Sequence, residues 1–161
     1  RSVYIESDSD VGTDGISDSD LLASVRSAIR IDPNTGEELE ALGLTDSTLF
    51  VESVQHIQFN IEIDELVVET AIETELKSEI ESAIEEYMTT MSPYCFGIDS
   101  EYKRNDNFSS VTISEKVNGI LKQYSATAAS ITVEEVGVGT ISLRQLIGGD
   151  LARLNVVSYV N

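Results

Sequence analysis

The sequence predicts a mixed α+β protein of two small α/β sandwich units, each a short sheet with helices packed on one face. Residues 48–63 alternate apolar and polar side chains over an unusual length, which is typical of a strand with one buried face. Residues 70–90 carry apolar side chains at helical spacing instead. The order of such elements along the chain divides into units 1–54 and 55–161.

The first unit is expected to hold a strand, an acidic loop, a helix and a second strand. Apolar and polar residues alternate in SVYIES, residues 2–7. The loop DSDVGTDGISDSD follows, and a helix is predicted over 17–30, because Ser17 with Asp20 three residues later forms a start like a capping box. The run DPNTG at 32–36 should end this helix in a turn.

The second unit is expected to begin with the long strand, whose apolar side chains should face the 70–90 helix. These side chains are Ile57, Phe59, Ile61 and Ile63. Thr112 with Glu115 predicts the start of another helix, which should end near Ser125. Strands are predicted at 131–136 and 154–160, with a glycine-punctuated segment between them.

Charge is distributed very unevenly along the chain. Residues 1–101 hold 24 acidic and 4 basic side chains, a balance of −20, whereas residues 102–161 hold 5 acidic and 6 basic, a balance of +1. Phosphate binding depends on Lys and Arg, so nucleic acid and acidic membranes are poor partners for the acidic part. No apolar run approaches the roughly 20 residues that span a bilayer. The chain begins at Arg1 and not at Met, so we expect a trimmed product or an excerpt.

The sequence offers no plausible catalytic residues, so we expect a protein that is not an enzyme and needs no cofactor. His56 is the single histidine and lies on the polar face of the predicted strand, away from any recognisable motif. Cys95 lies between two aromatic residues, which is typical of a buried thiol. One Cys and one His exclude a zinc site of the usual spacing.

One cluster of carboxylates has the residue types that calcium prefers. Its members are Asp8, Asp10, Asp14, Asp18 and Asp20. The spacing departs from the calcium loop, because Leu21 stands where the closing Glu is needed when the loop is aligned on Asp10. We therefore expect no metal there and interpret the cluster as a solvated loop that caps the following helix. A calcium-dependent extracellular binding module is the alternative.

The predicted helix at 70–90 is acidic outside its apolar stripe. Glu75, Glu79 and Glu86 line one flank, and Lys77 is the only basic residue in the helix. Like charges four residues apart destabilise a helix slightly. Two interpretations stay open for this face: a surface for a basic partner, and a plain solvated surface that adds solubility.

Several segments together resemble a known family. They are SVYIES with its acidic loop and DSDLLASVRSAI, then STLFVESVQHIQFNIEI, ETELKSEIESAIEEYM, and SSVTISEKVNGILKQY leading into SITVEEVGVG. In this pattern the chain resembles the C-terminal part of baseplate J-like proteins, wedge components of contractile-phage baseplates and of related tail-like injection machines. The likeness covers most of the chain but includes no invariant motif, and the insert SPYCFGIDSEYKRNDNF is longer than the family pattern suggests.

The resemblance implies a structural subunit of the virion tail, assembled in the host cytoplasm. Its expected partners are other baseplate and tail proteins and copies of itself, with no nucleic acid, membrane or small-molecule substrate. The neutral C-terminal segment, with Leu146 and Ile147 as exposed candidates, is expected to contact a neighbouring subunit. The acidic face with Glu75, Glu79 and Glu86 is expected to contact a different, basic protein.

Overall fold

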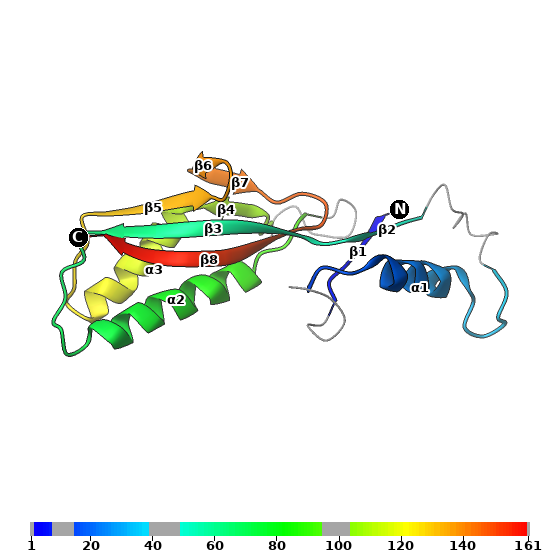
Figure 1. Ribbon diagram of the computed structural model, residues 1–161, viewed down its shortest axis with the longest axis horizontal. Coiled ribbons are helices and arrows are strands. Elements are labelled where there is room, and N and C mark those ends of the chain that lie inside the picture. Colours follow the sequence, from blue (N-terminus) through cyan, green and yellow to red (C-terminus); the bar gives the residue numbers. More distant parts are fainter. Residues whose placement is uncertain (1, 8–14, 39–48, 95–103, 161) are drawn as a thin grey trace. The chain divides into compact units, whose positions relative to one another are not determined.

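The computed structural model describes residues 2–7, 15–38, 49–94 and 104–160 (Figure 1). It confirms a mixed α+β fold of three helices and several small sheets. The chain divides into two compact units, Arg1–Gln55 (unit 1) and His56–Asn161 (unit 2), one residue after the expected boundary.

Unit 1 is a parallel pair of strands with one helix. β1 (Ser2–Ile5) pairs with β2 (Phe50–Ser53), and α1 (Ser19–Arg30) packs against β2. The predicted role of Ser17 at the helix start is wrong. Asp18 is the N-cap, and its Oδ1 accepts a hydrogen bond from the Leu21 amide at 2.8 Å. Ser17 instead links β1 to β2, because its amide donates to Ser53 Oγ in β2 and its hydroxyl donates to the Ile5 carbonyl in β1.

The long predicted strand is interrupted once. β2 ends at Ser53, and β3 (Gln55–Asp64) begins after the single residue Val54. Val54 is buried although it falls out of phase with the buried residues Val51 and Phe59. A side chain buried on the opposite alternation requires the strand to break there.

β3 is an inner strand of the four-stranded sheet of unit 2, whose order is β6-β5-β3-β8. It pairs antiparallel with β5 (Ser130–Glu135), which pairs antiparallel with β6 (Gly139–Thr140). β8 (Asp150–Val160) runs in the same direction as β3 (Figure 1), and the Glu65 amide donates to the Val160 carbonyl where the two strands end.

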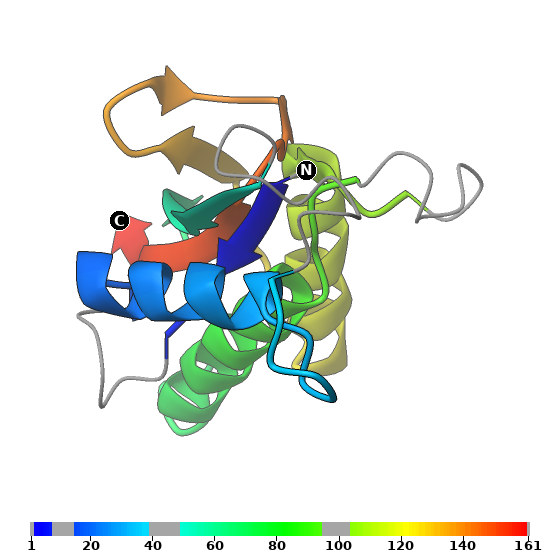
Figure 2. The same cartoon turned by 90° about the vertical axis from the view of Figure 1, so that its right-hand side faces the viewer.

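Two helices, α2 (Glu73–Thr89) and α3 (Ser110–Gln123), lie on one side of this sheet (Figure 2). As predicted, Phe59, Ile61 and Ile63 are fully buried in the core, and Ile57 packs against it. The helices contribute a continuous row of buried side chains. These are Leu76, Ile80, Ile84 and Met88 from α2 and Ile113, Val117, Ile120 and Leu121 from α3.

α3 begins two residues before Thr112, so the predicted capping box is wrong. Ser109 is the N-cap, and its hydroxyl accepts a hydrogen bond from the Val111 amide. The sequence did not predict β4 (Asn107–Ser109), which lies directly before this helix, or β7 (Leu143–Gln145), with which β4 pairs antiparallel. The predicted strand at 154–160 is β8, which begins four residues earlier.

Candidate functional site

The aspartates of the predicted calcium loop are only partly within the described residues. Asp8, Asp10 and Asp14 lie outside them. Asp18 caps α1, and Asp20 lies in the first turn, where carboxylates interact favourably with the positive end of the helix dipole. Among residues 2–7, 15–38, 49–94 and 104–160, no group of three or more His, Cys, Asp or Glu side chains is arranged to hold a metal ion.

We expect a millimolar calcium chelator to leave the thermal midpoint of the protein unchanged. The physical reason is that Asp18 already serves α1 and the loop lacks the closing bidentate Glu. Thermal unfolding followed by circular dichroism, with added calcium and with chelator, measures this. A fall of several degrees on chelation would instead favour the calcium-dependent binding module.

Two carboxylates of the acidic flank of α2 interact with Tyr124 within the unit, and Glu79 does so most strongly. Glu75 and Glu86 are exposed, but Glu79 accepts a hydrogen bond from the Tyr124 hydroxyl at 2.5 Å, at the end of α3. This hydrogen bond, with smaller contributions from burial and from the Glu75 charge, raises the pKa of Tyr124 to about 12. Glu79 therefore joins α2 to α3.

Substituting Glu79→Gln is expected to lower the pKa of Tyr124 toward its ordinary value of 10.0. A phenol whose pKa is raised on folding stabilises the fold fully below pH 10, and that contribution is lost as the pH rises toward 12. Tyrosinate absorbance measured against pH, with Tyr124→Phe to identify the transition, tests this. An unchanged transition in Glu79→Gln would contradict it.

Of the two apolar side chains expected to be exposed in the C-terminal segment, only Ile147 is exposed, and the prediction for Leu146 is wrong. Ile147 is 61% exposed, but Leu146 is 1% exposed and belongs to the core of unit 2. The Leu146 amide donates to the Asp106 carbonyl at 2.7 Å, which holds this segment against the core. Leu143 in β7 is 60% exposed and replaces Leu146 as an exposed apolar side chain of this segment.

The buried carboxylate of Asp106 is the polar group that sequence reasoning missed. It is fully buried, accepts from Arg104 Nε at 3.0 Å and again from Nη2, and accepts from Gln145 Nε2 at 3.0 Å. The hydrogen bonds from Arg104, despite opposition from burial, lower the pKa of Asp106 to about 2. Because Gln145 lies in β7, the cluster joins the segment before β4 to that strand.

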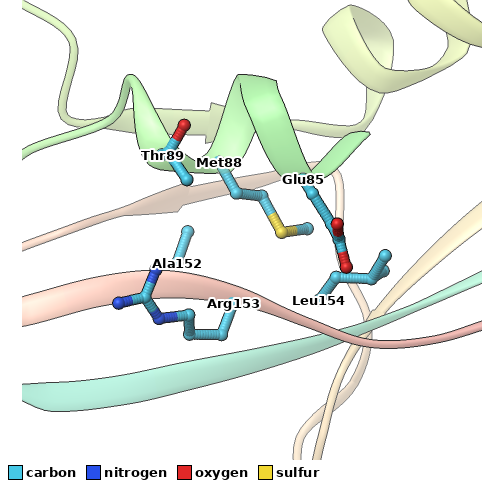
Figure 3. A pocket seen from close by; sticks show the side chains of 6 residues that line it. All are labelled: Glu85, Met88, Thr89, Ala152, Arg153 and Leu154. Atoms are coloured by element: carbon cyan, nitrogen blue, oxygen red, sulfur yellow. The ribbon is translucent and has the colours of Figure 1, made fainter. Parts of the chain in front are cut away.

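A pocket of about 270 Å³ lies between the C-terminal half of α2 and the start of β8. In Figure 3, Met88 points from the helix toward the strand, and the Glu85 carboxylate lies near Leu154. Thr89, Ala152 and Arg153 complete the lining.

His56 is not among the residues that line this pocket. His56 is half-buried in β3, and Cys95 lies outside the described residues. No helix within the described residues has both the length and the apolar character to cross a membrane.

No known protein-family model matches the chain, and no curated protein matches it either.

Proposed function

We propose that the chain is a structural, non-enzymatic subunit of a contractile phage tail baseplate, or of a tail-like injection machine, and acts through protein–protein interfaces. It is part of the virion tail in this proposal. The resemblance to baseplate J-like proteins supports it. The single observation that carries it is the exposure of apolar side chains near β6 and β7: Leu143 at 60%, Ile147 at 61% and Val138 at 71%.

Apolar side chains of this size are exposed at a cost, and a subunit of a ring has a neighbour to cover them. The acidic flank of α2 suits a second kind of contact. Glu75 and Glu86 are exposed there and are available to a basic protein, while Glu79 serves Tyr124. Binding at the acidic flank should weaken as salt rises, because the Debye length falls from about 10 Å at 0.1 M to about 3 Å at 1 M.

The test is made in the intact protein during tail assembly. Leu143→Asp combined with Ile147→Asp is expected to abolish assembled tails, scored by electron microscopy. Val67→Asp is the matched control, because Val67 is 66% exposed and lies elsewhere in unit 2. Normal tails in the double variant, with folding confirmed by circular dichroism, would refute the apolar contact.

The acidic contact is tested separately with Glu75→Lys combined with Glu86→Lys, which retains Glu79, the acceptor for the Tyr124 hydroxyl. Reduced assembly that is partly restored by a charge reversal in a basic tail protein is the expected result. Full assembly in this variant would remove the acidic flank from the proposal.

A further inference from the structure

We propose that the groove between β8 and α2 receives an extended, basic segment of a partner protein, which adds as a strand to the outer edge of β8. This surface differs from the two contacts above. The inference goes beyond the proposed function and does not depend on it, because an isolated chain can bind such a segment without any tail assembly.

The edge itself is the first observation. β8 is the last strand of its sheet, and within the described residues β3 is its only strand partner. Its 11 residues correspond to about 36 Å of strand. Proteins usually blunt such edges with Pro, Lys or a short strand, as the two-residue β6 does on the other side. β8 contains neither Pro nor Lys, its one basic residue is Arg153, and it exposes Val156 and Val160.

The pocket beside this edge is the second observation. Met88, Ala152 and Leu154 give it an apolar lining, with Glu85 and Arg153 as its charged residues (Figure 3). Its volume of about 270 Å³ falls just below the roughly 300 Å³ at which small-molecule sites begin. A pocket of this size next to an edge strand suits one or two side chains of an added strand, since alternate side chains of the strand point to the same face.

The charge of the groove selects the partner. Tyr159 of β8 donates to the Lys77 carbonyl and lies under the Lys77 ammonium, which is 4.5 Å from the ring centroid, so α2 follows the strand closely. Glu81 and Glu85 follow Lys77 at four-residue intervals on the same flank, and both are exposed. Neither has an ion-pair partner among the described residues, whereas Lys77 is paired with Glu73 at 2.6 Å.

Pairing of β8 with β8 of a second copy is disfavoured by the same charges. The chain carries a net charge of −19, and a symmetric edge-to-edge pair would bring two Glu81–Glu85 rows toward each other. A strand with alternating basic side chains would place cations beside these carboxylates instead. The occupant is therefore a basic strand from another protein.

The probe is a synthetic 12-residue peptide of alternating Lys and Val, titrated into the 161-residue chain at 0.15 M salt. We expect saturable binding that shifts the backbone amide resonances of β8 in nuclear magnetic resonance spectra. Two further peptides carry N-methyl groups on all Val or on all Lys residues. Since alternate amides of a strand point to opposite edges, one of these peptides should lose binding and the other should retain it.

Glu81→Gln combined with Glu85→Gln is expected to weaken binding roughly five- to tenfold, as for the loss of two exposed charge pairs. Glu37→Gln combined with Glu52→Gln is the matched control, because it removes the same charge from exposed positions in unit 1. Equal weakening in both double variants would show diffuse attraction to an acidic protein and overturn the proposal. Equal binding of both N-methylated peptides, unshifted β8 resonances, or dimers formed through β8 without peptide would also overturn it.

Discussion

Phe59→Asp is expected to unfold unit 2. Phe59 is fully buried at an inner strand, and its ring stacks on Phe108 with 4.0 Å between centroids. Removing a buried Phe costs about 3–5 kcal/mol, and burying a carboxylate in its place adds several more. That sum equals much of the roughly 5–15 kcal/mol by which a whole domain is stable.

Gln58→Asp is the matched control for this variant. Gln58 is the neighbouring residue in β3, is exposed, and carries its side chain to the other face of the sheet. Thermal unfolding followed by circular dichroism should show a midpoint close to that of the native protein for Gln58→Asp. A similarly unchanged midpoint for Phe59→Asp would show that β3 does not hold the core of unit 2.

The second large effect is expected at Arg104, whose guanidinium compensates the buried charge of Asp106. Arg104→Met leaves a fully buried carboxylate with Gln145 as its remaining side-chain donor. Removing one partner of a buried pair costs about 3–5 kcal/mol, and we expect the lower end because Arg104 itself is 37% exposed. Chemical denaturation should show this loss, and Lys122→Met on the exposed surface of α3 should not.

Two measurements distinguish this loss from a general effect of the Met side chain. Asp106→Asn in the Arg104→Met background should recover part of the stability, because no charge is then buried. The second measurement is the pH dependence of the free energy of unfolding. Since the pKa of Asp106 is lowered from 3.8 to about 2, its ionised form stabilises the fold above pH 4, and this contribution is lost as the pH falls toward 2. The Asp106→Asn variant should not lose this contribution as the pH falls. If the stability of the variant and of the native protein fell in parallel, Asp106 would not be its source.

The longest periodic segments of the chain could be predicted from sequence. The alternation that ends in Phe59, Ile61 and Ile63 gave β3 and its buried face, and the helical stripe of Leu76 and Ile80 gave α2. Both succeed because burial of one face imposes a period that ten or more residues repeat. The interruption at Val54 also had a signal in the sequence, an apolar residue out of phase with its neighbours.

The short strands could not be predicted, because two or three residues carry no period. β4, β6 and β7 exist through their partners, as in the pairing of Ser109 with Leu143, and such pairs are not visible in a linear pattern. The wrong prediction for Leu146 has the same cause, a contact with a segment distant in the sequence. Gly148 and Gly149 suggested an exposed loop, but a hydrogen bond to the distant Asp106 carbonyl holds Leu146 in the core.

The polar contacts show a similar division. Acidic residues on α2 were recognised from their spacing, yet nothing in the sequence indicates that Glu79 accepts from Tyr124 or that Asp106 is buried. The closest signal is the short spacing of Arg104 and Asp106, where an opposite charge lies two residues away in an otherwise irregular segment. Such pairs become informative only when tertiary structure removes one member from water.

The position of β3 within its sheet has a consequence for how the protein is made. β3 ends at Asp64, but its two neighbours begin at Ser130 and Asp150, so a ribosome must synthesise α2 and α3 before either edge of β3 is covered. Pairings between such distant segments slow folding. The backbone edges of β3 therefore remain available to chaperones, and to aggregation, until β5 and β8 have been synthesised. Unit 2 completes its sheet only after β8 has been added.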